Sequence, residues 1–141
     1  MAAAGQQANG QTGKRFATKI VYMILVAVDD LLFSSKIRTT AKQAGVALTF
    51  ARTPLEILEQ ARALRPALFI IDLNSAKADP IATVTAMKRD AELASIRTLG
   101  FVSHVHTELI AAARAAGVDD VMARSAFAGQ LADILLAATS Q

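Results

Sequence analysis

Acidic, hydroxyl and basic side chains stand directly after several short apolar runs of this 141-residue chain. Asp29 and Asp30 follow one run, and Asp72 follows the run ALFII. A buried carboxylate is costly unless a cation or hydrogen bonds compensate it, so Asp72 needs partners elsewhere in the chain. Ser103 and Arg124, each after a further apolar run, are candidates for those partners.

A carboxylate cluster of this kind suits a hard divalent cation. Oxygen ligands that leave room for water favour Mg²⁺. Arg124 would add a fixed positive charge at which anionic groups can assemble. Asp29 and Asp30 also have a second interpretation, in which they only favour the start of a helix through its dipole.

Five apolar runs rich in β-branched residues are expected as strands. They span residues 23–28, 46–50, 67–71, 98–102 and 120–123. The segments between them have a helical period and are too long for hairpins. Crossover helices between apolar strands indicate a parallel sheet covered on both faces. The expected fold class is α/β, a (βα)₅ unit whose ligands bind at the carboxyl ends of the strands.

Local signals mark the helix ends. Thr53, Pro54 and Glu56 have the pattern of a capping box that starts the second helix. Asp79 and Pro80 are expected to open the third helix in the same way. A final helix is expected to start at Ser125, with an inward face of Phe127, Leu131, Ile134 and Leu135.

Composition and charge narrow the possible classes. With 53% hydrophobic and 19% charged residues, the chain suits one compact domain, and the absence of cysteine excludes disulfides and thiolate metal sites. The net charge of +3 comes from the three basic residues and no acid in residues 1–22, which leaves 12 basic against 12 acidic residues. The charge therefore gives no case for nucleic-acid binding.

Residues 1–22 are expected to be a disordered leader, and residues 23–141 one domain. The basic leader and the run IVYMILVAV imitate a secretory signal, but the run is too short to span a bilayer and acids follow at once. Met23 is an alternative start. We therefore expect no membrane association and a cytoplasmic protein.

In order and spacing, these motifs resemble the response-regulator receiver domain of two-component signalling over residues 23–139. ILVAVDDLLF is similar to that family's first strand and acidic pair, and LFIIDLN to its third strand with the phospho-accepting aspartate. GFVSH resembles the strand with the switch hydroxyl, and AAGVDDVMARSAF the alanine-glycine turn, last strand and basic residue. The resemblance implies a flavodoxin-like three-layer sandwich with strand order 2-1-3-4-5.

The resemblance also implies roles for single residues. Asp72 would be the phosphoacceptor, a carboxylate nucleophile. Asp29 and the backbone carbonyl of Asn74 would join Asp72 as Mg²⁺ ligands. Ser103 would hydrogen-bond a phosphoryl oxygen, and Arg124 would stand where the family's lysine bridges the phosphoryl group.

Departures from the family pattern fall in this same site. An ungapped alignment puts Val28 at the first metal-binding acid, whereas a one-residue gap restores Asp29 and Asp30 as the full acidic pair of metal ligands but shortens the first helix. Arg124 and Ser125 replace lysine and proline, and a forked guanidinium is not equivalent to a compact ammonium.

Two further departures lie nearby. Ser75 and Ala76 replace methionine and proline after the acceptor, which is expected to loosen that loop. Val121 occupies the place of an aromatic switch residue, so a coupling of hydroxyl to ring is absent. Together the departures predict a degenerate receiver, or pseudo-receiver, whose phosphorylation is weakened or abandoned.

The expected function is a single-domain receiver in phosphorelay signal transduction, not an enzyme. It would dock a histidine kinase, another receiver, an output protein or a second copy of itself. The docking face would be formed by the fourth helix, fifth strand and fifth helix. That face would contain Leu109, Ala113, Val121, Phe127 and Leu131 or their exposed neighbours.

Two interpretations come from other classes. A small flavodoxin-like enzyme or nucleotide binder would need a glycine-rich phosphate loop after the first strand, and VDDLLFSS contains no glycine. A metal site at His104 and His106 would need a third ligand, so a surface loop is the better interpretation of that pair.

Overall fold

The computed structural model describes residues 22–103 and 106–139. The expected leader therefore lies outside the described residues except for Tyr22, and so does His104 of the histidine pair. Among the helices in the described ranges, none is both long and apolar enough to cross a bilayer.

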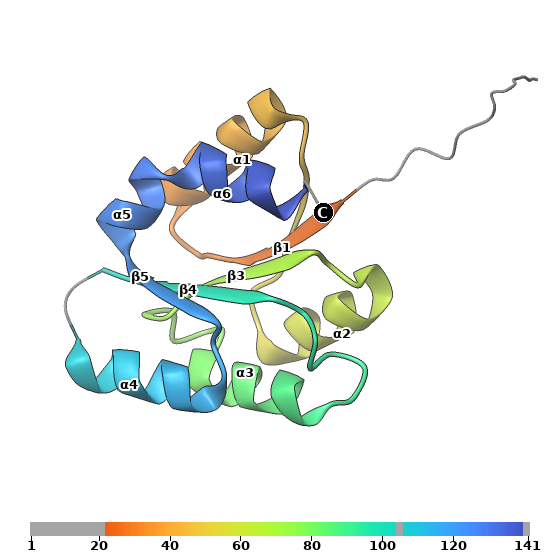
Figure 1. Ribbon diagram of the computed structural model, residues 1–141, viewed down its shortest axis with the longest axis vertical. Helices are drawn as coiled ribbons and strands as arrows, with labels where there is room; N and C mark the ends of the chain where they lie inside the picture. Colours follow the sequence, from red (N-terminus) through yellow and green to blue (C-terminus); the bar gives the residue numbers. More distant parts are fainter. Residues whose placement is uncertain (1–21, 104–105, 140–141) are drawn as a thin grey trace, which may run out of the picture.

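Five parallel strands form one sheet with the order β2-β1-β3-β4-β5, which confirms the expected topology (Figure 1). Their bounds are β1 Met23–Ala27, β2 Ala47–Phe50, β3 Leu68–Asp72, β4 Thr98–Val102 and β5 Asp120–Ala123. Every strand agrees with its expected range to within one residue at each end. The agreement has a physical basis, because all residues of β3 and β4 are buried, so both faces of these strands must be apolar.

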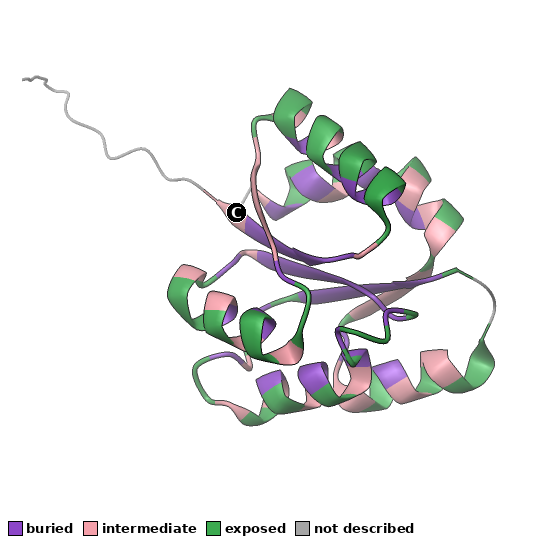
Figure 2. Cartoon of the chain, turned by 180° about the vertical axis from the view of Figure 1, so that it is seen from behind, coloured by how far each residue is buried: buried purple, intermediate pink, exposed green. Residues whose placement is uncertain are grey.

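Helices cover both faces of the sheet, so the molecule has three layers (Figure 1). The helices are α1 Leu31–Ala44, α2 Pro54–Leu64, α3 Pro80–Arg89, α4 Thr107–Ala116, α5 Arg124–Gly129 and α6 Leu131–Ala138. One core lies between the sheet and α2, α3 and α4, and a second lies between the sheet and α1, α5 and α6. Figure 2 shows the buried sheet between helices whose outer sides are exposed.

The helix starts confirm one capping prediction and correct the other. The Thr53 hydroxyl accepts a hydrogen bond from the Glu56 N–H, and the Glu56 carboxylate accepts one from the Thr53 N–H, which completes the capping box. Asp79, in contrast, makes no side-chain cap. It has a left-handed backbone with φ of 43°, whereas a capping side chain requires an extended one.

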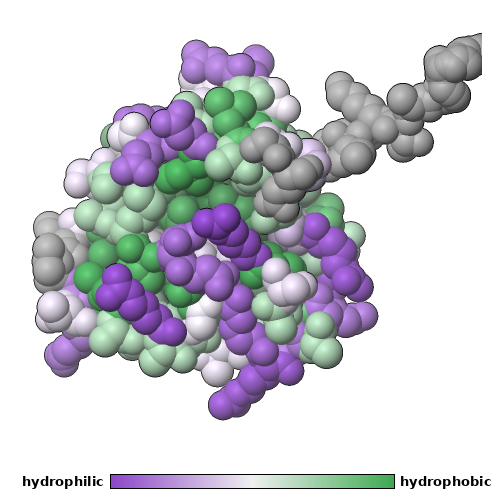
Figure 3. All heavy atoms as spheres, viewed as in Figure 1, coloured by the Kyte–Doolittle hydropathy of each residue, from purple (hydrophilic) through white to green (hydrophobic). Residues whose placement is uncertain are grey.

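The expected final helix is two helices, which corrects the prediction of a single element. α5 ends at Gly129 and α6 begins at Leu131, with Gln130 between them at φ −110° and ψ 10°. Glycine is a poor helix former, so a break beside Gly129 costs little. α6 packs on α1, and a hollow remains between α6 and the starts of β3, β4 and β5, where hydrophobic atoms are visible in Figure 3.

Candidate functional site at the carboxyl ends of the strands

Asp72 lies at the centre of the edge at which the parallel strands end. It is the last residue of β3, and the sheet pairs it with Phe101 of β4 on one side. On the other side the last β1 pair is Ala27 with Ile71, so the next position of that strand, beside Asp72, is Val28. The β1 neighbour of Asp72 is therefore an apolar side chain.

The Asp72 carboxylate is buried, with 8% of the residue exposed, and one of its oxygens accepts a hydrogen bond of 2.9 Å from the Asn74 N–H. Burial raises the pKa of Asp72 above its ordinary value, and the negative charges of Asp29 and Asp30 raise it further. The hydrogen bond from Asn74 and the positive charge of Arg124 act on this pKa in the opposite direction. All three acids and Arg124 therefore share one electrostatic environment.

Asp29 is held by the loop that follows β3. Its carboxylate accepts a hydrogen bond of 2.9 Å from the hydroxyl of Ser75, which is itself buried and accepts one of 3.3 Å from the Ala78 N–H. The hydroxyl of Ser75, a residue expected to loosen this loop, connects the loop to the segment that follows β1. This contact was missed in the sequence because the partners are 46 residues apart.

The Asp30 carboxylate is held at the start of α1. One carboxylate oxygen accepts a hydrogen bond of 3.0 Å from the Phe33 N–H, which caps α1, and the other lies 2.8 Å from Arg124 Nη2. The hydrogen bond from Phe33 and, after it, the contact with Arg124 lower the pKa of Asp30. Asp30 therefore caps the start of α1 and also forms an ion pair with Arg124.

Arg124, the first residue of α5, lies over an aromatic cluster. Its Cζ atom is 4.3 Å from the centroid of the Phe33 ring and 5.9 Å from that of Phe101. Among the described residues its ion pair is with Asp30, and it makes none with Asp72. The sequence placed Arg124 at this edge but could not show which carboxylate it contacts.

Asn74 and Ser103 connect the ends of β3 and β4. The side-chain oxygen of Asn74 accepts hydrogen bonds of 2.8 Å from the Ser103 N–H and 3.0 Å from its hydroxyl. Both residues are exposed. The Ser103 hydroxyl is thus at the expected edge and can rotate towards an anionic group on Asp72 only by leaving Asn74.

The residues at this edge provide only some of the ligands that a metal ion needs. Within the described part of the chain, no three His, Asp or Glu side chains are grouped so that they could hold one ion. Both oxygens of Asp30 already have partners, which leaves Asp29, Asp72 and the Asn74 backbone carbonyl. Two carboxylates and a carbonyl are hard oxygen donors, and Mg²⁺ commonly takes one or two protein carboxylates and keeps several waters. The donor set therefore fits Mg²⁺ with few protein ligands.

Comparison with known proteins identifies the fold. No family model and no curated protein matches the sequence. Among solved structures, a response regulator from Hahella chejuensis superposes with a TM-score of 0.76 at 18% identity, covering 84% of this chain and 96% of that chain. The phosphorylated cyanobacterial phytochrome response regulator RcpA has a TM-score of 0.70 at 21% identity, with coverages of 84% and 91%.

A Mn²⁺-bound response regulator has a TM-score of 0.67 at 18% identity, covering 82% of this chain and 90% of that chain. These similarities extend over nearly the whole of the other chains. This chain has five parallel strands in the order β2-β1-β3-β4-β5, with helices on both faces. The chain therefore has the fold of response-regulator receiver domains.

Proposed function

We propose that this chain is a receiver-like signalling module that acts by docking to another protein, with Asp72 as a phosphoacceptor of reduced reactivity. The observation that carries the proposal is the convergence of Asp29, Asp72, Ser103 and Arg124 at the carboxyl edge of the sheet, although they are far apart in the sequence. Solved structures of the same fold include a phosphorylated and a Mn²⁺-bound response regulator.

The proposed chemistry is phosphoryl transfer to a carboxylate. An oxygen of Asp72 attacks the phosphorus of a small phosphodonor, and the bond from phosphorus to the donor's leaving oxygen breaks. With acetyl phosphate the leaving group is acetate. Mg²⁺ bound by Asp29, Asp72 and the Asn74 carbonyl would supply positive charge for the transferred group, and Ser103 would donate a hydrogen bond to one of its oxygens.

Three features support reduced reactivity. Val28 stands beside Asp72 where a second acid could bind the metal. Arg124 makes its ion pair with Asp30 rather than with Asp72. The Ser103 hydroxyl already donates a hydrogen bond to the side-chain oxygen of Asn74. A phosphoryl group on Asp72 would therefore lack one metal-binding acid. It would gain Arg124 and Ser103 as partners only after these residues leave Asp30 and Asn74.

The proposed partners are a histidine kinase, another receiver, an output protein or a second copy of the chain. Of the residues expected on the face of α4, β5 and α5, Ala113, Phe127 and Leu131 are buried, and Leu109 and Val121 are half-buried. A partner on this face would therefore contact their exposed neighbours. Val121 offers no ring to follow Ser103, which favours docking that is independent of phosphorylation.

Intact-mass spectrometry after incubation with Mg²⁺ and acetyl phosphate tests the proposal. We expect little labile adduct on the native chain, more on a Val28→Asp, Arg124→Lys variant, and none after Asp72→Asn. An adduct on Asp72→Asn would overturn the assignment of the acceptor. An adduct on neither the native chain nor the double variant would overturn the receiver chemistry altogether.

A further inference from the structure

Arg124 has two anionic neighbours and contacts only one of them. Its Nη2 atom is 2.8 Å from an oxygen of Asp30. Its positive charge also lowers the pKa of Asp72, so the two groups are close enough to interact without forming an ion pair. A forked guanidinium that moved onto a phosphoryl group could bind two of its oxygens, but it would have to leave Asp30.

An aromatic surface adds a second restraint on Arg124. The Phe33 and Phe101 rings are 5.2 Å apart edge to face, and the Phe101 and Phe127 rings are stacked at 4.7 Å. The guanidinium lies 4.3 Å from the Phe33 centroid, where a planar cation is attracted to the ring face. Lysine, which has no planar group, would gain less at this position.

Both restraints come from the first turn of one helix. Asp30 caps α1 through the Phe33 N–H, so the carboxylate and the ring are fixed relative to each other. Arg124 begins α5, and Phe127 of the same helix belongs to the ring cluster. The contact therefore joins the start of α1 to the start of α5 across the edge of the sheet.

We infer that Asp30 and Phe33 are positioning residues that hold Arg124 on α1 and withhold it from Asp72. The inference rests on the proposed function and extends it to the regulation of that site. Transfer of Arg124 from Asp30 to a phosphoryl group would uncover the Phe33 ring and displace the first residue of α5. This movement would replace the missing coupling from hydroxyl to aromatic ring at Val121.

The decisive variant is Asp30→Asn. Asparagine caps a helix as well as aspartate does, so α1 keeps its start while the ion pair with Arg124 is lost. The matched control is Asp120→Asn, which removes the 2.9 Å ion pair between Asp120 and Arg97 at the opposite edge of the sheet. A purely structural role predicts the same effect for both variants, a small loss of thermal stability and no gain in reactivity.

Two measurements on the full chain test the inference, an NMR spectrum of the Arg124 side chain and the rate at which Asp72 forms the adduct. In nitrogen-resolved NMR spectra, the Arg124 side chain of the native protein should carry a ring-current shift from Phe33, which Asp30→Asn reduces and Asp120→Asn leaves in place. With Mg²⁺ and acetyl phosphate, Asp30→Asn should form the Asp72 adduct about two- to fivefold faster than the native chain, the scale of one partly exposed ion pair. Asp120→Asn should match the native rate.

Other outcomes overturn the inference in distinguishable ways. A native Arg124 without a ring-current shift means that the contact does not exist, whatever the chemistry of Asp72. An unchanged or lower rate in Asp30→Asn, while Val28→Asp, Arg124→Lys accepts the phosphoryl group, overturns the positioning role and leaves the proposed function standing. An adduct in no variant overturns the proposed function and the inference together.

Discussion

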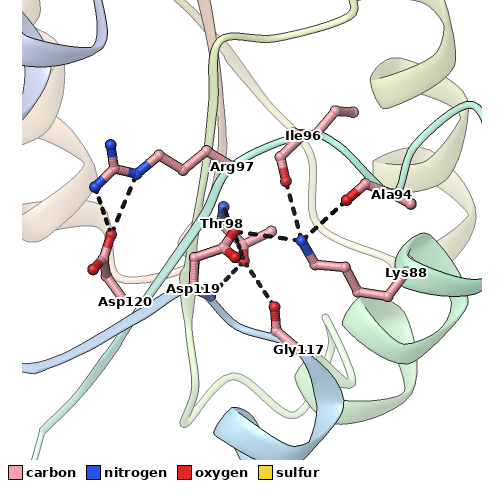
Figure 4. A network of polar contacts seen from close by, with 8 residues as sticks. All are labelled: Lys88, Ala94, Ile96, Arg97, Thr98, Gly117, Asp119 and Asp120. Carbon is pink, nitrogen blue, oxygen red and sulfur yellow. Dashed lines mark hydrogen bonds and ion pairs between the residues drawn. The ribbon is translucent and has the colours of Figure 1, made fainter.

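Thr98 and Asp119 bind each other through three hydrogen bonds at the edge where β4 and β5 begin (Figure 4). The Asp119 carboxylate accepts from the Thr98 N–H at 2.8 Å and from its hydroxyl at 3.0 Å, and the Asp119 N–H donates to that hydroxyl at 2.9 Å. Lys88 of α3 adds a contact of 3.4 Å to the same carboxylate. This network fixes the start of β5, the strand that leads directly into Arg124, the first residue of α5.

Thr98→Val should lower the free energy of unfolding by about 1–3 kcal/mol, because Thr98 is fully buried and the change leaves the Asp119 N–H without its acceptor. Urea unfolding followed by circular dichroism measures the effect. Thr40→Val is the control, since the Thr40 hydroxyl only bonds a carbonyl of its own helix near the surface, and it should change stability by less than about 0.5 kcal/mol. Equal losses would contradict the role of the network.

Acid should weaken the same network. Burial alone would raise the pKa of Asp119, but hydrogen bonds from Thr98 and the charge of Lys88 outweigh it, so this pKa lies below the ordinary 3.8. The stabilisation is therefore present above pH 3.8 and is lost as the pH falls through the native pKa. As the pH is lowered from about 6 to about 2, the melting temperature should fall less steeply for Asp119→Asn than for the native chain.

Asp72→Asn should stabilise the protein at neutral pH. Burial raises the native pKa of Asp72 above the ordinary 3.8, so the native state binds more protons than the unfolded state between the two values. Stability of the native chain therefore falls as the pH rises through that interval. The variant should melt a few degrees higher at pH 7, and the difference should vanish below pH 3.8.

The control for that experiment is Glu59→Gln, a neutralised acid on the exposed side of α2, which should leave the melting temperature nearly unchanged at both pH values. A destabilised Asp72→Asn at pH 7 would contradict the conclusion that the partners of the buried Asp72 carboxylate compensate its charge only in part.

Gly100 and Gly129 should respond to alanine in opposite directions. A Cβ atom at Gly100 would lie 2.9 Å from Leu73, the residue after Asp72, so Gly100→Ala should cost about 1–3 kcal/mol of stability. A Cβ atom at Gly129 would meet nothing within 4 Å, so Gly129→Ala should stabilise α5 by up to about 1 kcal/mol. Chemical denaturation compares them, and losses of similar size would contradict the packing of Gly100 on Leu73.

Magnesium binding should be weak and should improve with one added acid. Titration of the native chain with MgCl₂ should shift the backbone amide signals of Asp29, Asp72 and Asn74 only at high concentration, because two carboxylates and one carbonyl supply the protein ligands. Val28→Asp adds a carboxylate beside Asp72 and should lower the concentration needed by roughly tenfold or more. Shifts that are confined to other regions would argue against this edge as the metal site.

The strands and most helix ends could be predicted because local physics decides them. Apolar runs such as LFII are buried on both faces, and the capping box at Thr53 acts within one turn. The break at Gln130 could not be predicted, since a helix tolerates one glycine and only the packing of α6 on α1 separates the two pieces.

The site was predicted as a set of residues but not as a set of contacts. Parallel strands bring Asp29, Asp72 and Ser103 to one edge whatever their side chains do. Which carboxylate receives Arg124 depends on the ring of Phe33 and on the cap of α1, and those partners are up to 94 residues apart in the sequence. Such choices are made by tertiary packing and leave no local pattern.

The parallel sheet also decides where both ends of the described chain emerge. Met23 begins β1 at the edge opposite Asp72, and Ala138, at the end of α6, lines the hollow beside the start of β3 (Figure 1). An affinity tag or a tether to a sensor surface that is joined close to Met23 or Ala138 would therefore be attached at the edge of the sheet opposite Asp72. Protein immobilised at either of these points would leave the edge with Asp72 accessible to partners in solution.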